Sequence, residues 1–521
     1  LLSRTQILSA SNSSSRQFGY SITMSDDNQW LYVGAPGSDQ VIVYGYDSSV
    51  EEDVDTLTVS NANVATFAIT FDPIVAELIT IANSTVEFVP YRDFTVSTLV
   101  PGTSGTVTFS SNAIPDTYVV RKLGPGFREV TTIQGTANTK FGFSVASSTE
   151  GAQVVIGAPF SNVTVGNASL QSAGTISVYD RSIEKFIAIA GQTLFGGYRT
   201  PLSFSKVYVN NELQVEGIDY NIVFTNWVQF VVEPGAGKII TIETDEFNLI
   251  EQTAAATPLA ETQFGYSVDL CPYNCSIYSG APYYNSDASQ GKFATGVVYR
   301  HVNQSRIYGN ITGNVQYPTV TSGSSIRLND YEVFFLSTTL EDVVTTINNE
   351  GIPGVTAANA NGYISLTSNG TVIADKLRVL PGAGSALSEL GLDVFIQTEI
   401  IDNPTGFVND QFGQRVFIDD TSERLLVGST EAITIVDTTF DLSTVETTFD
   451  ADGTRFKDEV DAGAVWVFNY LGDSRNNINN AGNFAYVQQL KPSNVTAPNF
   501  QIAEGIKFGS AFDVQNQRLF V

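Results

Sequence analysis

Short runs of β-branched and aromatic residues, separated by polar turns, dominate the hydrophobic pattern of this chain. A typical pair is Phe18–Ile22 and Leu31–Val33, with the polar turn Ser25–Asn28 between them. Runs of this length and composition predict β-strands joined by tight turns. Apolar residues at helical spacing stand at 339–347, and a second short helix is predicted at 385–392. The pattern therefore predicts an all-β fold with short helices in one region.

The strand pattern repeats along the chain. A Phe-Gly pair is followed, sixteen residues after the Phe, by Gly-Ala-Pro; the fourth copy keeps only the Gly, and a fifth copy begins near residue 508. The repeat-defining residues are Phe18, Gly19, Gly34, Ala35, Pro36, Phe141, Gly142, Gly157, Ala158, Pro159, Phe264, Gly265, Gly280, Ala281, Pro282, Phe412, Gly413, Gly428, Phe508 and Gly509. Self-similarity of this kind predicts an array in which each unit needs neighbours to bury its apolar face.

Each copy predicts four antiparallel strands, which is one blade of a β-propeller. The first two strands flank a polar turn, the third follows Gly-Ala-Pro, and the fourth begins with a Phe. These fourth strands are predicted at Phe127, Phe247, Phe395 and Phe484. Small residues at Gly-Ala-Pro suit a place where backbones converge, and the recurrent Phe is predicted to pack between neighbouring blades.

These copies resemble the FG-GAP repeat, the blade of the integrin α-subunit propeller. The resemblance covers the blade segments, well under half of the chain. It implies an FG-GAP-type β-propeller, partial in this chain. The sequence between the blade strands predicts inserted β-rich modules, one with a short helix. The family's calcium loops lie between the first two blade strands. The corresponding loops here, 24–29, 146–153, 269–276 and 418–423, lack the alternating carboxylates that calcium needs.

Successive Phe-Gly pairs are separated by 123, 123, 148 and 96 residues, more than a blade needs. The surplus predicts three modules between third and fourth strands, all projecting from one face, and a long connection at 431–462 in the fourth copy. The predicted division is 1–47 blade segments, 48–125 inserted β module, 126–181 blade segments, 182–245 inserted β module, 246–302 blade segments, 303–393 inserted α+β module, and 394–521 blade segments with an incomplete last blade.

The inserted segments have patterns of their own. The first two are similar to each other, and the turns at Asn210-Asn211 and Gly217–Tyr220 resemble modules of bacteriophage tail-fibre and other virion proteins. The third predicts a helix capped by Thr339 and ended by Gly351, followed by a hairpin of 355–357 with 363–366. This third pattern is similar to modules inserted in flagellins and phage surface proteins.

Composition excludes some classes of function. The chain has 26 basic and 54 acidic residues, a net charge of -28, so nucleic-acid binding is not expected. No run approaches the roughly 18 apolar residues of a membrane-spanning helix, so membrane insertion is not expected either. The low charged fraction of 15% suits an extracellular protein. Because residues 4–8 resemble the tail of a fourth strand, the chain is predicted to be a segment of a longer polypeptide.

Candidate chemistry is sparse. Asp450 and Asp452, in Asp-Ala-Asp-Gly, are the nearest fragment to a calcium loop and the metal candidates; no other cofactor is predicted. No catalytic constellation stands out, and His301, the only histidine, is expected to be a surface residue. Cys271 and Cys275 are compatible with a local disulfide or with free thiols.

The leading hypothesis is a non-enzymatic structural and adhesive protein on the surface of an extracellular particle, most simply a phage virion component in a tail fibre, baseplate or neck appendage. Expected partners are other virion or surface structural proteins and a host cell-surface glycan or protein; homo-oligomer formation stays open. One alternative is a cellular surface adhesin with an integrin-like propeller. Another is a secreted polysaccharide-acting enzyme with a carboxylate pair that no sequence feature selects.

Overall fold

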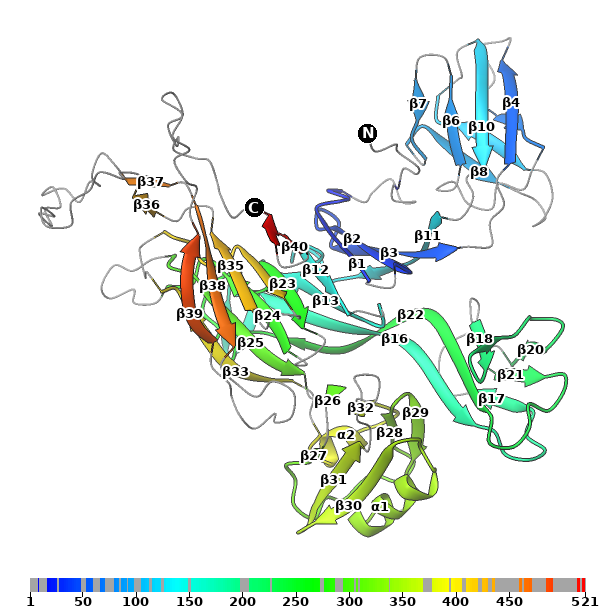
Figure 1. The fold of residues 1–521 in the computed structure, drawn as a ribbon, viewed down its shortest axis with the longest axis vertical. Coiled ribbons are helices and arrows are strands. Elements are labelled where there is room, and N and C mark those ends of the chain that lie inside the picture. The colour runs from blue at the N-terminus through cyan, green and yellow to red at the C-terminus, as the bar shows by residue number, and fades with distance from the viewer. Residues whose placement is uncertain are drawn as a thin grey trace, which may run out of the picture. The chain divides into compact units, whose positions relative to one another are not determined.

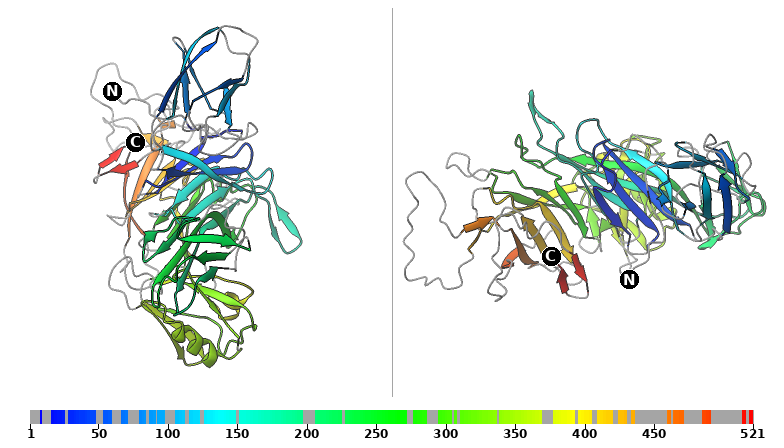
Figure 2. Two further views of the ribbon diagram at one scale, coloured as in Figure 1. Left: turned by 90° about the vertical axis from the view of Figure 1, so that its right-hand side faces the viewer. Right: turned by 90° about the horizontal axis from the view of Figure 1, so that it is seen from above.

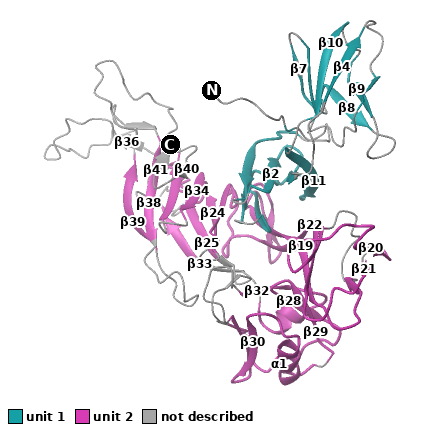
Figure 3. Ribbon diagram, turned by 45° about the vertical axis from the view of Figure 1, so that its right-hand side comes forward, with its two compact units in different colours: residues 1–158 teal, residues 159–521 magenta. Residues whose placement is uncertain are grey.

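The computed structural model describes residues 8, 16–25, 28–47, 53–59, 66–70, 79–83, 86–90, 92–97, 105–111, 115–122, 126–148, 151–196, 206–224, 227–271, 276–285, 294–303, 306–307, 310–336, 338–368, 377–392, 395–404, 409–419, 424–429, 433–435, 459–461, 463–470, 484–490, 513–515 and 518–520. These residues form many small β-sheets and two short helices (Figures 1 and 2). The predicted all-β class is confirmed. The chain divides into two compact units, residues 1–158 and 159–521, described separately below (Figure 3).

Three of the predicted repeats each form a four-stranded antiparallel sheet in chain order. The first contains β1 (Ser21–Met24), β2 (Trp30–Ala35), β3 (Gln40–Asp47) and β11 (Gly126–Gln134); the third contains β23 (Ser267–Cys271), β24 (Ser276–Ala281), β25 (Val297–Asn303) and β33 (Phe395–Asp402); the fourth contains β34 (Arg415–Asp419), β35 (Arg424–Ser429), β38 (Ala464–Tyr470) and β39 (Phe484–Leu490). In the second repeat, β12 (Ser144–Ser147) pairs with β13 (Gln153–Ala158), and β16 (Thr175–Ile187) pairs with β22 (Ile239–Thr253). Each predicted fourth strand is confirmed.

The fourth strand carries the same irregularity in each of these four repeats. Its register against the third strand shifts by one residue, which leaves one extra residue in the fourth strand. The extra residues are Val130, Ile250, Thr398 and Val487. Each is the third residue after the Phe that was predicted to begin the fourth strand: Phe127, Phe247, Phe395 or Phe484. Because a bulge bends a strand and increases its twist, the four outer strands share one local bend.

The first inserted module has two small sheets. One has the order β4 (Asp53–Val59), β10 (Asp116–Lys122), β6 (Ile79–Ala82) and β7 (Glu87–Phe88); the other has β5 (Thr66–Ala68), β9 (Thr106–Phe109) and β8 (Phe94–Ser97). Their apolar faces form one core, in which the rings of Phe88, Phe109 and Tyr118 lie within 5.6 Å of one another. This module therefore has a hydrophobic core of its own.

The second inserted module grows out of β16 and β22 without a break. Both strands continue past the predicted boundaries at 182 and 245, with a register shift between Arg181 and Ile183. The module adds β17 (Leu194–Gly196), β18 (Lys206–Val209), β19 (Glu212–Leu213), β20 (Tyr220–Val223) and β21 (Trp227–Phe230). Tyr220 is buried in its core. A separate hairpin, β14 (Val163–Val165) with β15 (Ala168–Leu170), precedes β16.

The third inserted module is the predicted α+β segment. Its elements are β26 (Arg306–Ile307), β27 (Asn310–Thr312), β28 (Ser325–Leu328), β29 (Tyr331–Phe334), α1 (Leu340–Asn349), β30 (Val355–Ala360), β31 (Tyr363–Ser368), β32 (Leu377–Pro381) and α2 (Ala386–Glu389). The predicted cap is confirmed, since Thr339 accepts a hydrogen bond from the backbone of Asp342, and Gly351 follows the helix at a φ of 64°. The predicted hairpin is also confirmed, as β30 paired with β31. Helix α1 buries Leu340, Val343 and Ile347 in the module's core.

Two further hairpins complete the described elements. They are β36 (Ile433–Ile435) with β37 (Glu459–Asp461), and β40 (Asp513–Gln515) with β41 (Arg518–Phe520). The first lies within the predicted long connection 431–462 of the fourth repeat. This connection joins β35 to β38, which pair directly with each other. The metal candidates Asp450 and Asp452, and Phe508 and Gly509 of the fifth copy, lie outside the described residues.

Candidate functional site

Consecutive repeats are joined by the same hydrogen bond at two places. The hydroxyl of Ser21 donates to the carbonyl oxygen of Gly142 at 2.8 Å, and the hydroxyl of Ser267 donates to that of Gly413 at 2.8 Å. Each Ser stands two residues after the Gly of its own Phe-Gly pair, and each acceptor is the Gly of the next pair. Neighbouring first strands therefore meet in one register at both joints.

The first position of Gly-Ala-Pro accommodates only glycine, because the backbone of the next repeat lies against it. A Cβ added to Gly34 would clash with the carbonyl oxygen of Gly142, and a Cβ added to Gly280 would clash with that of Gly413. Gly142 and Gly413 have φ angles of 85° and 96°, a region that glycine adopts without steric cost. The predicted convergence of backbones at this motif is confirmed at both joints.

The recurrent Phe is also part of the joint. The backbone N–H of Phe412 donates to the carbonyl of Thr295, in the preceding repeat, at 3.2 Å. Its ring belongs to one core cluster with Tyr278 of the third repeat and Trp466 of the fourth. The predicted packing of this Phe between neighbouring repeats is therefore confirmed for Phe412.

A buried carboxylate, Asp269, lies in the joint between the third and fourth repeats. Its Oδ2 accepts the N–H of Ile418, on β34 of the next repeat, at 2.7 Å, and its Oδ1 accepts the N–H of Leu270 at 2.9 Å. Burial raises the pKa of this carboxyl from 3.8 to about 6, although the two N–H groups and the charge of Arg415 act in the opposite direction. A group that titrates near pH 6 therefore contacts both repeats.

His301 lies on β25 and is only 2% exposed, which corrects the expectation of a surface residue. Its ring centroid is 5.5 Å from that of Phe264. Tyr44 and Phe468 hold the same position beside the recurrent Phe of the first and fourth repeats. Neither ring nitrogen has a hydrogen-bond partner among the described residues, and burial lowers the pKa of His301 from 6.5 to about 4. His301 thus occupies the position of an aromatic core residue.

The polar residue next to His301, Arg300, is buried and has polar partners on neighbouring strands. Arg300 is 4% exposed. Its Nη1 lies 3.7 Å from Oε2 of Glu399 on the paired strand β33, and its Nε donates to the hydroxyl of Ser276 at 3.0 Å. Pairing of these charges allows the segment to be buried, which is why its polarity wrongly suggested a surface position.

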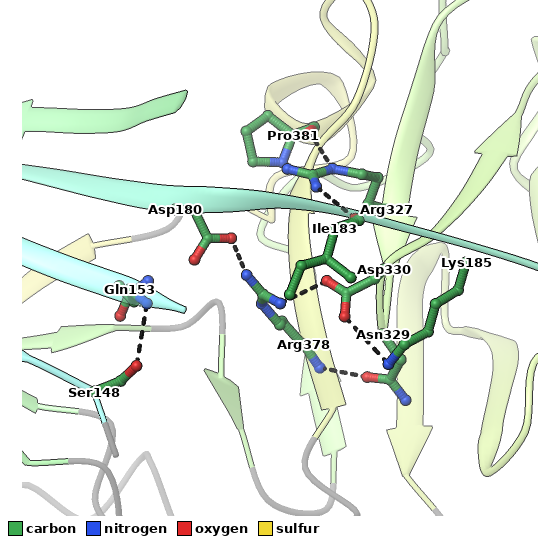
Figure 4. Close-up of polar contacts among 10 residues, drawn as sticks. All are labelled: Ser148, Gln153, Asp180, Ile183, Lys185, Arg327, Asn329, Asp330, Arg378 and Pro381. Carbon is green, nitrogen blue, oxygen red and sulfur yellow. Dashed lines mark hydrogen bonds and ion pairs between the residues drawn. The ribbon is translucent and has the colours of Figure 1, made fainter. Parts of the chain in front are cut away.

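A cluster of four charged side chains, three of them largely buried, joins β16 to the third inserted module (Figure 4). Arg378, on β32, contacts the fully buried carboxylate of Asp180, on β16, through Nη2. Its Nη1 donates to Oδ1 of Asp330 at 2.5 Å. The other oxygen of Asp330 lies 3.4 Å from Nζ of Lys185, also on β16. We call these four residues the charge cluster.

Neighbouring polar groups hold the charge cluster in position. The side chain of Asn329 accepts the backbone N–H of Arg378 at 2.8 Å. Arg327, 1% exposed, donates to the carbonyls of Pro381 at 3.2 Å and Ile183 at 3.5 Å (Figure 4). The carboxylates are thus engaged by Arg and Lys, an arrangement that fixes one element against another. Loss of one partner would leave an uncompensated buried charge.

The remaining sequence-predicted site residues are only partly covered by the structure. The calcium candidates Asp450 and Asp452 stay a prediction, since they lie outside the described residues. Among the residues that are described, no group of three or more His, Cys, Asp or Glu side chains is placed to hold a metal ion. Cys271 is buried on β23, and Cys275 lies outside the described residues, so their pairing also stays a prediction.

No helix in the described part of the chain is both long enough and apolar enough to cross a membrane. No family model matches the sequence, and no curated protein shows significant similarity to it.

Proposed function

We propose that the repeats are blades of an FG-GAP-type β-propeller, present in part in this chain. Four features support the proposal: the four-stranded antiparallel sheets, the bulge at one position of each outer strand, the Ser-to-Gly hydrogen bond at two joints, and the Phe-Gly spacing. Joints of one kind between successive repeats give a similar rotation from each repeat to the next. A ring or a solenoid of repeats requires such a regular rotation.

An exposed apolar face of β1 in the first repeat also supports this proposal, because the equivalent face of the fourth repeat is buried. Ile22 and Met24, on β1, are 61% and 46% exposed. The equivalent residues of the fourth repeat, Val416 and Ile418, are 2% and 6% exposed. Val416 and Ile418 pack in one core cluster with Tyr278 of the preceding repeat. In the proposed ring, a further blade covers Ile22 and Met24 in the same way.

The function we propose is that of a non-enzymatic structural and adhesive protein of an extracellular particle, most simply a phage virion component such as a tail fibre, baseplate or neck appendage. The observation that carries it is that each inserted module has a hydrophobic core of its own and lies in the chain between the third and fourth strands of a repeat. Such modules can carry contacts to other proteins while the repeats supply a rigid base. The charge cluster adds rigidity between two of them.

Peptide mass spectrometry tests this function. Purified particles and, separately, host cell envelopes are digested and searched for peptides of residues 1–521. Peptides at a stoichiometric level in particles are the expected result. Peptides confined to envelopes would overturn the virion proposal in favour of a cellular adhesin. Glycan turnover by the purified chain, lost on replacing one carboxylate pair, would instead establish an enzyme.

A further inference from the structure

The second inserted module has a groove at its surface. The groove has a volume of about 250 Å³ and is lined by Val209, Glu212, Gln214, Ile218, Asp219, Phe230, Val231, Val232, Glu233 and Pro234. Small-molecule pockets are usually larger, roughly 300–1,000 Å³. A space of this size suits one or two side chains of a bound segment better than a whole ligand.

Part of the groove wall is apolar and exposed to solvent. Ile218, Val231 and Val232 are 69%, 58% and 76% exposed. More large apolar side chains of the same module are also exposed, at Ile189, Leu213, Val215 and Phe224. Contiguous exposed apolar surface costs solubility, and where it lies beside polar residues it marks sites of interaction. The groove therefore has the features of a surface that binds a partner.

The rest of the groove wall is acidic. Three of the ten lining residues are Glu or Asp, and none is Lys or Arg. Backbone contacts hold two of the carboxylates in place: Asp219 accepts the N–H of Val215 at 2.8 Å, and Glu233 accepts that of Gly191 at 2.7 Å. A partner that pairs with this wall must bring positive charge, because complementary charge selects partners and speeds their encounter.

We propose that the groove binds an extended segment of a partner protein in which an apolar side chain is flanked by Lys or Arg. The apolar side chain packs against Ile218, Val231 and Val232, and the basic side chains face Glu212, Asp219 and Glu233. Among the strands that the structure describes, β19 is the last at this end of its sheet, so a segment can run beside it. A second copy of this chain fits poorly, since each copy carries a net charge of -28.

This inference deepens the proposed function and rests on it in one respect, that the inserted modules carry the contacts to partners. The test measures binding of fluorescein-labelled peptides to the full chain by fluorescence anisotropy. The probes are Gly-Lys-Leu-Lys-Leu-Lys-Gly, its polar counterpart Gly-Lys-Ser-Lys-Ser-Lys-Gly, and its acidic counterpart Gly-Glu-Leu-Glu-Leu-Glu-Gly. We expect the first to bind about tenfold more tightly than either of the others, because only it matches both walls.

Two variants of the groove and one matched control make the test specific. Ile218→Lys should weaken binding of the first peptide about tenfold, whereas Ile189→Lys, equally exposed but outside the groove, should not change it. The double variant Glu212→Gln, Glu233→Gln keeps the side-chain carbonyl that holds Gly191 and should also weaken binding. It decides the question if Ile218→Lys does not fold.

Three results would overturn the proposal: equal binding of all three peptides, binding unaffected by both groove variants, or self-association of the chain that Ile218→Lys abolishes. The last would make a second copy the occupant. None of these results bears on whether the chain is found in particles, so the proposed function stands or fails separately.

Discussion

The hydroxyl of Ser267 lies 2.8 Å from the carbonyl oxygen of Gly413 and donates a hydrogen bond to it. Ser21 makes the same contact with Gly142 in the other compact unit. Both Ser residues are directly opposite the Gly of Gly-Ala-Pro in their own sheet, in the pairs Ser21 with Gly34 and Ser267 with Gly280. One position of the repeat thus combines a close backbone approach with the hydrogen bond that satisfies the approaching carbonyl.

Replacing Gly280 with Ala should loosen the joint between the third and fourth repeats. The new methyl group would clash with the backbone of Gly413 and the hydroxyl of Ser267. Overpacking of this kind costs about 1–3 kcal/mol. Urea denaturation followed by Trp fluorescence, to which the buried Trp466 of this joint contributes, should show a lower midpoint.

The control for this variant is Gly191→Ala. Gly191 has a φ of 81° but nothing near its missing Cβ, so only backbone strain of about 1 kcal/mol is expected. A loss of stability in Gly280→Ala no larger than in the control would contradict the packing role of Gly280.

Replacing His301 with Phe should stabilise the protein at acidic pH. The folded pKa of about 4 lies below the ordinary 6.5, so the unfolded chain binds the proton more tightly. The neutral ring therefore contributes stability that is present above about pH 6.5 and is lost as pH falls toward 4, by about 3 kcal/mol. Phe468 shows that Phe fits this position in another repeat.

The measurement is the free energy of unfolding of His301→Phe minus that of the wild type, at pH 4, 5, 6 and 7. The difference should grow in favour of the variant as pH falls. A difference that does not change with pH would show that His301 has the same pKa in the folded and unfolded states, which would contradict its burial.

Replacing Asp269 with Asn should have the opposite pH dependence. The folded pKa of about 6 lies above the ordinary 3.8, so the folded chain binds the proton more tightly. Wild-type stability due to this group is therefore greatest below about pH 4 and falls by about 3 kcal/mol as pH rises through 6. Asn cannot ionise, so the variant should gain relative to the wild type as pH rises across this window.

The contributions of Asp269 and His301 oppose each other between about pH 4 and 6. Combining Asp269→Asn with His301→Phe should therefore restore the flat pH profile of the wild type across this range, as far as these two groups determine it. A pH-dependent change in the double variant that differs from the sum of the changes in the two single variants would show that the two groups do not titrate independently.

Replacing Arg378 with Met should strongly destabilise the second compact unit. Asp180 and Asp330 are 0% and 5% exposed and would lose their shared cation. Removing one partner of a buried ion pair costs about 3–5 kcal/mol. Adding Asp180→Asn should recover part of this loss, since it removes a buried charge. Arg92→Met, in an exposed pair with Asp93, is the control and should leave the melting temperature unchanged. Equal effects of the two Arg variants would contradict the structural role of the charge cluster.

Local features of the sequence were sufficient to predict the strands of the repeats and the helix and hairpin of the third inserted module. Alternating apolar residues around Phe-Gly and Gly-Ala-Pro predicted the hairpins, and the Phe at the fourth strands predicted where each sheet ends. Thr339 and the apolar spacing after it predicted α1, because a helix start is determined by residues within one turn. These elements were therefore predictable from short windows of sequence.

What only the tertiary structure decided involves residues far apart in the chain. Arg378 and Asp180 are separated by 198 positions, and no local signal pairs them. The same holds for Asp269, whose carboxylate meets Ile418 149 positions away, and for His301, whose polar neighbours suggested the surface. The physical reason is that burial and charge pairing depend on which strands are brought together. A sequence window shows the polarity of a side chain but not the partner that allows it to be buried.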